Sequence, residues 1–323
     1  MRAAVLSEPG EPPSHDEHPA PEAAAGRTVV RMTAAPIVPL DLLCASGTSY
    51  FGRPATPYVP GTQGVGVVEE STTWPEGARV FVVTTAGMAP GDGSLAERCA
   101  VPDEAVVPLP DGVADDDAAA LGMSAVAAWM ALTARAQLAP GERVVVLGAG
   151  GTVGQVAVAA AKLLGADRVV AVCRSPAAEE RARRAGADEV VRLDPDVDRL
   201  TDLLRDAVGG SADVVVDPVF GVAATAASRV LSSFGRLVNL GGMGGDVAEF
   251  SSAVLRSRTA SVLGYTNAML SPEQQRTALD AVLGHAAAGR LAVAHERLPL
   301  AGVADAWRRQ ASGDAGVRLV LTP

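Results

Sequence analysis

Two patterns of hydrophobic and polar residues follow one another along the chain. Up to about residue 115, short β-like runs such as RTVVRMTAA, GVGVVEE and ARVFVVTT are separated by clusters of proline, glycine and aspartate. Such runs, bounded by turn residues, predict a compact all-β unit. The stretch from Glu8 to Ala25 is rich in proline, alanine and glutamate. We expect it to be a solvated loop, with His15 and His18 at the surface.

From about residue 140, apolar runs rich in β-branched residues alternate with helical segments. This alternation predicts a parallel sheet covered by helices on both faces. Beyond Leu263, two helices are expected, over Pro272 to Ala288 and Val303 to Gln310, followed by a final strand, VRLVLTP. The predicted strands of the parallel sheet are Arg143 to Leu147, Arg168 to Cys173, Glu189 to Leu193, Asp213 to Asp217 and Arg236 to Leu240.

The composition is typical of a folded protein that acts on small molecules. Of the 323 residues 48% are hydrophobic, which is enough to bury the core of one large domain or two ordinary ones. The apolar stretches are too short to span a bilayer and the start of the chain lacks a secretory pattern, so we expect a cytoplasmic protein without a membrane span. A net charge of −10 opposes non-specific binding of nucleic acid. Cys44, Cys99 and Cys173 lie far apart, which favours free thiols over disulfides or a cysteine zinc site.

A glycine-rich loop follows the first predicted strand of the parallel sheet, in VVVLGAGGTVGQVAVAAAKLLGA. Gly148, Gly151 and Gly154 stand between that strand and a helix, where a backbone without Cβ bends sharply and approaches a pyrophosphate. The backbone of Thr152 and Val153 is expected to meet this group. A tight turn without a ligand is the alternative, but the strand–helix alternation that follows favours a dinucleotide site.

The end of the second strand decides the choice of cofactor, because NAD-binding sites commonly place a carboxylate there against the ribose 2′-hydroxyl. Here the strand ends at Cys173 and is followed by Arg174 and Ser175. A guanidinium in place of a carboxylate suits a 2′-phosphate, so NADPH is favoured over NADH. The alternative is that Arg174 is a solvated loop residue. Arg181 could assist, or could instead pair with a neighbouring glutamate.

Polar residues and glycines also follow the fourth and fifth strands of the predicted sheet. Ligands of parallel sheets bind at these carboxyl ends of strands. Ordinary turn geometry is the alternative explanation for the glycines. The cofactor-binding candidates at these ends are Asp217 and Phe220 after the fourth strand, and Asn239, Gly241 and Gly242 after the fifth.

An ordered set of motifs runs almost from end to end of the chain: AAPIVPLDLLCASG, YVPGTQGVGVVEE, GSLAERCAVP, GAGGTVG, ADVVVDPVFG, GRLVNLGG and GVRLVL. The set resembles the medium-chain dehydrogenase/reductase superfamily, in its zinc-free quinone oxidoreductase and enoyl reductase branch. The resemblance implies an α/β protein with a GroES-like β-rich catalytic domain, residues 1–118 and 264–323, and a Rossmann-type doubly wound parallel sheet, residues 119–263. It also implies a homodimer.

The resemblance indicates which residues replace the family's functional ones. Where zinc-using relatives carry cysteine, histidine and glutamate, this chain has Val38, Thr62 and Gln63, so no catalytic zinc is expected. Val38 also stands where the zinc-free branch has an asparagine near the nicotinamide. Other polar positions of that branch are likewise apolar here, at Leu43, Ala45, Ala127 and Leu193, so the pocket is less polar than in the family.

In this branch the acceptor binds beside the nicotinamide, in a cleft. The candidate polar groups there are Tyr50, Thr62 and Asp41. Tyr50 could donate to a substrate oxygen or simply pack with Phe51, and Thr62 could face the cleft or cap a turn. Asp41 is expected to hold its loop through backbone N–H groups rather than to relay protons. Arg318 matches a basic residue of the terminal motif and could contact the cofactor or be structural.

The resemblance favours an NADPH-dependent, zinc-independent reductase that transfers hydride to an activated C=C bond, as in an enone or enoyl group, or to a quinone, and that acts in a biosynthetic pathway. The alternative is a family member that retains its cofactor without net redox turnover and instead binds, senses or rearranges a ligand. A short-chain-type carbonyl reductase is excluded, because Lys162 has no tyrosine four residues before it. The partner is expected to be an apolar small molecule, with specificity set by the loops Ala45 to Tyr58 and Gly264 to Leu270.

Overall fold

The computed structural model describes residues 1–313 and 315–323 of the chain. These residues divide into two units. The first contains Met1–Gly122, Leu279–Gly289 and Val293–Pro323, and the second contains Met123–Ala278 and Arg290–Ala292. Residues 264–278, which the resemblance assigns to the β-rich domain, therefore belong to the second unit.

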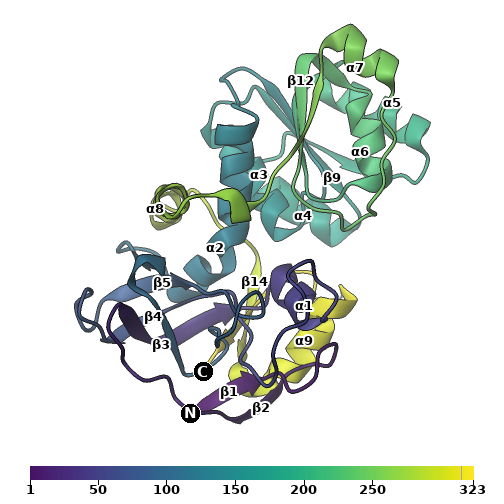
Figure 1. The fold of residues 1–323 in the computed structure, drawn as a ribbon. Helices are drawn as coiled ribbons and strands as arrows, with labels where there is room; N and C mark the ends of the chain where they lie inside the picture. The colour runs from purple at the N-terminus through teal and green to yellow at the C-terminus, as the bar shows by residue number, and fades with distance from the viewer. Residues whose placement is uncertain (314) are drawn as a thin grey trace. The chain divides into compact units, whose positions relative to one another are not determined.

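The second unit is built on a six-stranded sheet in which every pair of neighbouring strands is parallel (Figure 1). The strand order is β10-β9-β8-β11-β12-β13, so the chain starts at the centre, moves to one edge and then crosses to the other. This order is that of a doubly wound sheet and confirms the predicted fold class. The strands are β8 (Arg143–Val146), β9 (Arg168–Cys173), β10 (Glu189–Arg192), β11 (Ala212–Asp217), β12 (Leu231–Asn239) and β13 (Ser261–Gly264).

Helices cover both faces of this sheet, which explains why its strands are continuous apolar runs. Figure 1 shows α3 (Thr152–Leu163) and α4 (Pro176–Arg184) on one side of the sheet, and α5 (Val197–Val208), α6 (Gly221–Ser228) and α7 (Ser252–Arg258) on the other. The core beneath α5 and α6 contains fully buried side chains from the strands and both helices, among them Val145, Val170, Val215, Leu200 and Leu204.

The first unit contains a seven-stranded sheet in the order β14-β15-β3-β4-β5-β7, with β6 paired to β3. Its pairs are antiparallel except for β14 with β15. A cluster of buried side chains from β3, β4, β5 and β6 fills one region of the core. The strands are β3 (Arg27–Pro36), β4 (Gln63–Glu70), β5 (Arg79–Val83), β6 (Arg98–Pro102), β7 (Val106–Pro108), β14 (His295–Pro299) and β15 (Arg318–Thr322).

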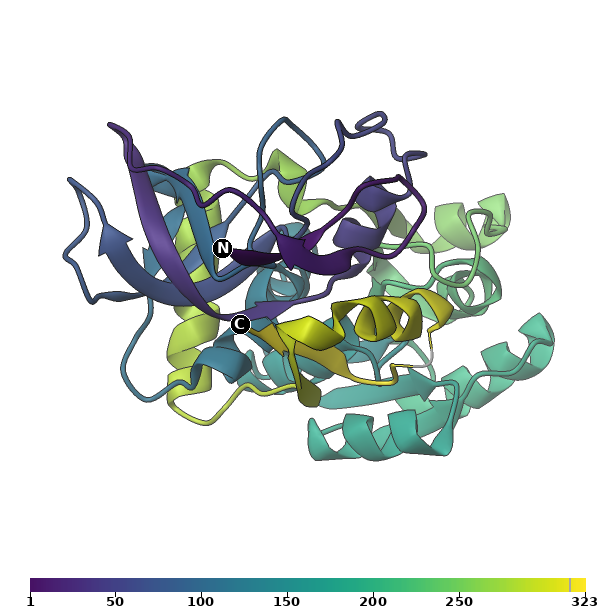
Figure 2. The ribbon, with the colours of Figure 1, turned by 90° about the horizontal axis from the view of Figure 1, so that it is seen from below.

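A separate hairpin, β1 (Arg2–Val5) and β2 (Ser14–Glu17), corrects the prediction of a solvated loop over residues 8–25. Figure 2 shows this purple hairpin beside the yellow helix α9 (Val303–Ser312), and the buried side chains of β1 and α9 share one core cluster. His18 is not a free surface residue, because its ring bonds to Asp92 at 2.9 Å.

The helices α2 (Asp115–Met130) and α8 (Pro272–Ala287), with 16 residues each, are the longest helices in the described part of the chain. A π-helical segment, Ala131–Arg135, continues α2. Among the described residues this combined helix, Asp115–Arg135, is the one that is long and apolar enough to cross a membrane by length and composition alone. It starts with three aspartates, is kinked at Gly122, where φ is 41°, and is more than half buried in its most apolar part. These are features of a core helix of a folded protein.

Candidate functional site

The glycine loop of the second unit joins β8 to α3 and forms a tight turn. The N–H of Gly151 donates to the carbonyl of Gly148 at 3.0 Å, and Gly148 has a φ of +61° that favours glycine. A Cβ on Gly148 would lie 2.6 Å from the Val219 side chain, and a Cβ on Gly154 would lie 2.4 Å from the carbonyl oxygen of Gly148. The close packing of the loop on itself and on Val219 therefore requires both glycines.

Gly151 differs from its neighbours because nothing in the protein requires it to be glycine. A Cβ built on it would approach one atom only, the carbonyl oxygen of Gly148 at 3.4 Å, and the residue is exposed. Gly151 is the N-cap of α3, where no side chain caps the helix, so the backbone N–H groups of Thr152 and Val153 have no side-chain acceptor there. An open glycine before an uncapped helix fits the pyrophosphate of a dinucleotide.

The three residues at the end of β9, residues 173–175, differ in burial and in hydrogen bonding. Cys173 is buried at the strand end, and Ser175 caps α4 by accepting the N–H of Ala178 at 3.3 Å. Arg174 between them is exposed, and no hydrogen bond or ion pair engages it within residues 1–313 and 315–323. Arg181 does not pair with a glutamate: its Nε donates to the carbonyl of Gly150 in the glycine loop at 2.9 Å.

Asp217 and Asn239 connect the ends of β11 and β12. One oxygen of the fully buried Asp217 carboxyl accepts the N–H groups of Val219 at 2.9 Å and of Phe220 at 2.7 Å. The Asn239 side chain donates to the carbonyls of Asp217 at 3.2 Å and of Gly241 at 2.7 Å. Burial raises the pKa of Asp217, and these hydrogen bonds oppose the rise. The two polar side chains hold the loops after their strands in place.

The same two loops contain the other predicted cofactor-binding residues. Phe220 has a positive φ of 62°, which is unusual for a residue with a side chain. A Cβ on Gly241 would lie 2.7 Å from the carbonyl oxygen of Pro218, so a close approach of the loops requires this glycine. Gly242 is exposed, and a Cβ on it would first meet Asp246 at 3.0 Å.

Asp41 lies at the centre of the candidate residues of the first unit, near the start of α1 (Pro39–Ala45). Its carboxyl is buried and accepts the N–H of Val38 at 2.8 Å and the N–H of Thr62 at 2.9 Å. The buried Arg318 donates to the carbonyl of Ile37 at 3.0 Å. Burial raises the pKa of Asp41 to about 6, although its hydrogen bonds and the charge of Arg318 oppose the rise. Val38 and Thr62 are both buried, so in this unit the carboxyl joins two backbone segments.

Two tyrosines of the first unit stand in contrasting positions. Tyr50, a predicted catalytic residue, is 78% exposed, and its ring centroid lies 4.3 Å from that of Phe51. Tyr58, which the sequence did not single out, is buried, and its hydroxyl has no hydrogen-bond partner within the described part of the chain. A Cβ on Gly87 would lie 2.8 Å from both this hydroxyl and the Cβ of Cys44. No spacing in the sequence indicates this arrangement.

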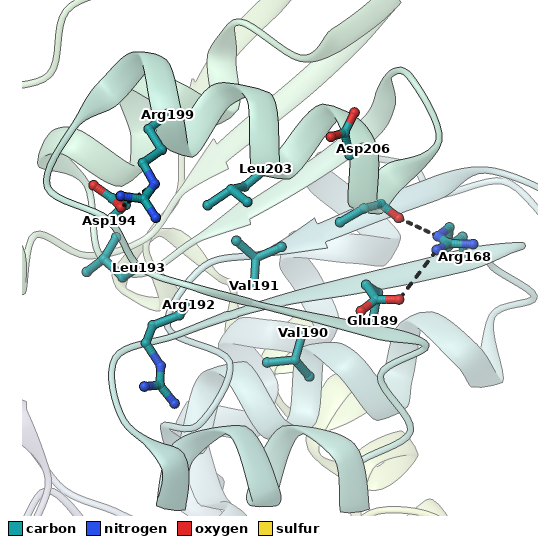
Figure 3. A pocket seen from close by; sticks show the side chains of 11 residues that line it. Arg168, Glu189, Val190, Val191, Arg192, Leu193, Asp194, Arg199, Leu203 and Asp206 are labelled. Carbon is teal, nitrogen blue, oxygen red and sulfur yellow. Dashed lines mark hydrogen bonds and ion pairs between the residues drawn. The ribbon is translucent and has the colours of Figure 1, made fainter.

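A groove of about 580 Å³ lies along the edge strand β10 and helix α5 of the second unit (Figure 3). Four of its charged residues pair with one another: Arg168 lies 3.8 Å from Glu189, and Arg199 lies 3.2 Å from Asp194. Of the positions named from the sequence, Leu193 lines it, whereas the candidate catalytic and cofactor-binding residues do not. No group of three or more histidine, cysteine, aspartate or glutamate side chains that could hold a metal ion occurs in residues 1–313 and 315–323.

Comparison with known proteins defines the class of the chain. The pattern described as "Alcohol dehydrogenase GroES-like domain" matches residues 24–111, and the one described as "Zinc-binding dehydrogenase" matches residues 152–283. A GroES-like unit and a doubly wound parallel sheet occur together in this α/β chain. It belongs to the medium-chain dehydrogenase/reductase superfamily, as the motifs of the sequence predict.

Three similar proteins illustrate the relationship. A probable oxidoreductase from Mycobacterium abscessus is 30% identical, with a TM-score of 0.83 over 100% of this chain and 99% of that one. The quinone oxidoreductase of Thermus thermophilus, solved with its NADPH complex, is 30% identical, with a TM-score of 0.79 over 100% of both chains. A phenolphthiocerol/phthiocerol polyketide synthase polypeptide of Mycobacterium tuberculosis is 32% identical over 91% of this chain, which spans only 13% of that much longer polypeptide.

Proposed function

We propose that this chain is an NADPH-dependent, zinc-independent reductase that transfers hydride to an activated C=C bond, as in an enone or enoyl group, or to a quinone. One observation carries the proposal: an open glycine at an uncapped helix, Gly151, stands in the same unit as Arg174, an exposed arginine that has no partner among the residues described by the structure. The first suits a diphosphate and the second suits a 2′-phosphate.

The residues of the second unit would bind and orient the cofactor. When bound, NADPH supplies a hydride to the electrophilic carbon of the acceptor. The N–H groups of Thr152 and Val153 would hold the diphosphate, and Arg174 would pair with the 2′-phosphate. Asp217 and Asn239 keep the two strand-end loops in a fixed position, so this part of the site is preorganised.

The acceptor side is proposed from the residues of the first unit. Tyr50, Thr62, Asp41 and Val38 are the candidates. Asp41 acts as a positioning residue, because its carboxyl is occupied by the N–H groups of Val38 and Thr62. Val38, Thr62 and Gln63 offer no set of ligands for zinc, so the proposed chemistry relies on orientation of the acceptor and exclusion of water. The second proton would come from solvent.

The similar proteins support this proposal. The Thermus thermophilus relative is a quinone oxidoreductase with a known NADPH complex. Similarity to a polyketide synthase fits a biosynthetic acceptor with a conjugated carbonyl. From the family resemblance we also propose a homodimer and a cytoplasmic location. Light scattering of the purified chain at several concentrations tests the dimer.

The test is consumption of NADPH, followed by its near-ultraviolet absorbance, with a panel of enones, enoyl thioesters and quinones. We expect turnover with at least one class, the same rate after treatment with a chelator, and a lower KM for NADPH than for NADH. Tight NADPH binding without turnover across the whole panel would instead support the alternative, a cofactor-retaining protein without net redox chemistry. The apolar positions Val38, Leu43, Ala45 and Ala127 together favour that alternative.

A further inference from the structure

Gly150 is the point where side chains of two helices contact the glycine loop. Its carbonyl accepts the Nε of Arg181 from α4 at 2.9 Å and the Nε2 of Gln155 from α3 at 3.1 Å. A Cβ on Gly150 would lie 2.3 Å from the Cβ of Ala178, so α4 approaches the loop as closely as two small residues allow.

Arg181 differs from the other arginines of α4 in the kind of group that it contacts. Arg184 pairs with Glu180 at 3.0 Å, and Arg183 lies 3.9 Å from Glu179. Arg181 contacts a neutral carbonyl instead, and in the part of the chain that the structure describes no carboxylate pairs with it. Its positive charge is therefore not cancelled, although the side chain is half-buried beside the loop.

The contact also determines the direction of the next peptide group. Because a peptide is planar and trans, fixing the carbonyl of Gly150 fixes the N–H of Gly151 on the opposite side. That N–H closes the turn by donating to the carbonyl of Gly148 at 3.0 Å. The helix α3 starts directly after this turn, so the position of its first N–H groups depends on the same peptide.

We propose that Arg181 is a positioning residue for the diphosphate-binding loop. Its guanidinium fixes the peptide between Gly150 and Gly151 and keeps a positive charge beside the N–H groups at the start of α3. The inference rests on the proposed function in one respect, namely that a dinucleotide binds at these N–H groups. Arg181 would support the binding of NADPH and NADH to the same extent, whereas Arg174 would distinguish the two cofactors.

The first test measures the loop in the full chain without any nucleotide. Hydrogen–deuterium exchange of the amides of residues 148–154 is compared among wild type, Arg181→Met, Arg181→Lys and the control Arg184→Gln, which removes an exposed ion pair from the same helix. We expect faster exchange of these amides in Arg181→Met by about tenfold, the size of effect that a hydrogen bond to a charged group carries. Arg184→Gln should match wild type, and equal exchange in Arg181→Met and wild type would overturn the proposal.

The second test measures the dissociation constants of NADPH and NADH. Arg181→Met should weaken both by a similar factor of about ten, with KM raised and kcat unchanged, and Arg181→Lys should recover most of the loss because it keeps a charged N–H donor. A loss confined to NADPH would overturn the positioning role, since Arg181 would then act on the 2′-phosphate. Failure of Arg181→Lys to recover binding would also overturn it. If wild type binds neither dinucleotide, the proposed function fails, while the exchange measurement still decides the role of Arg181 in the loop.

Discussion

Replacement of Gly151 by alanine tests whether the glycine loop binds a ligand, because this substitution should change binding without changing how the loop folds. A Cβ at Gly151 meets only the carbonyl oxygen of Gly148, at 3.4 Å, and the φ of −81° and ψ of 172° are ordinary for alanine. The lower entropy of the unfolded alanine variant stabilises the fold by about 0.4–1 kcal/mol, and alanine at an N-cap costs a similar amount. We therefore expect a free energy of unfolding within about 1 kcal/mol of wild type.

Two other glycines provide the contrast and the control. In Gly150→Ala the new Cβ would lie 2.3 Å from the Cβ and 2.6 Å from the Cα of Ala178. Because the backbone of α4 has to move, we expect a loss of at least about 1–3 kcal/mol of stability. In Gly284→Ala, within α8, nothing lies within 4 Å of the new Cβ, and helix propensity predicts a gain of up to about 1 kcal/mol.

The assay combines urea unfolding with fluorescence titration of NADPH. Gly151→Ala should unfold like wild type but bind NADPH at least about tenfold more weakly, because the methyl group keeps a phosphate away from the N–H groups of α3. Gly284→Ala should bind like wild type. If Gly151→Ala keeps the affinity of wild type, the open space at Gly151 is not where a diphosphate approaches, and the proposal loses the observation that carries it.

Three further predictions concern Arg174 and Asp41. Arg174→Gln should raise the dissociation constant of NADPH by about tenfold or more while that of NADH stays constant, as titration of both cofactors would check. Asp41→Ala should lower the free energy of unfolding by about 3 kcal/mol or more, because the buried N–H groups of Val38 and Thr62 lose their acceptor. Asp41→Asn keeps one oxygen and should lower the free energy of unfolding less. Urea unfolding of both variants checks this. The pKa of Asp41 in the folded protein, about 6, lies above that of an aspartate in an unfolded chain, so the folded state binds this proton more tightly. The stability of wild type relative to Asp41→Asn should therefore fall as pH rises from about 4 to about 6, by on the order of 3 kcal/mol. A difference in stability that is constant with pH would contradict this.

The sequence predicts five of the six strands of the parallel sheet, because a strand that is buried on both faces is recognised as a continuous apolar run. It misses the edge strand β13, in which no residue is fully buried. The sequence does not predict strands whose pairing depends on residues far away along the chain. The strand β2, of sequence SHDE, is polar throughout and forms only because it pairs with β1. The strand β12 begins at Leu231 rather than Arg236, since its register with β11 shifts around Phe234, whose φ of 60° no local pattern of apolar residues indicates.

The two arginines after β9 show the same limit within the candidate site. The position of Arg174 follows from the sequence, because a residue directly after a buried strand lies at the sheet edge whatever the later helix does. The partner of Arg181 depends on how closely α4 approaches the loop, and Ala178 and Gly150 set that distance together, 31 residues separating Arg181 from the carbonyl it reaches. A larger side chain at either of these two positions would move α4 away from the loop and break this contact. Glu180 and Glu179 lie one and two residues before Arg181, a spacing that does not bring side chains together on a helix, whereas Arg183 and Arg184 each lie four residues after their glutamate. The spacing of charges along α4 therefore gives Arg181 no partner on its own helix, but only the packing of the two small residues brings the carbonyl of Gly150 within its reach.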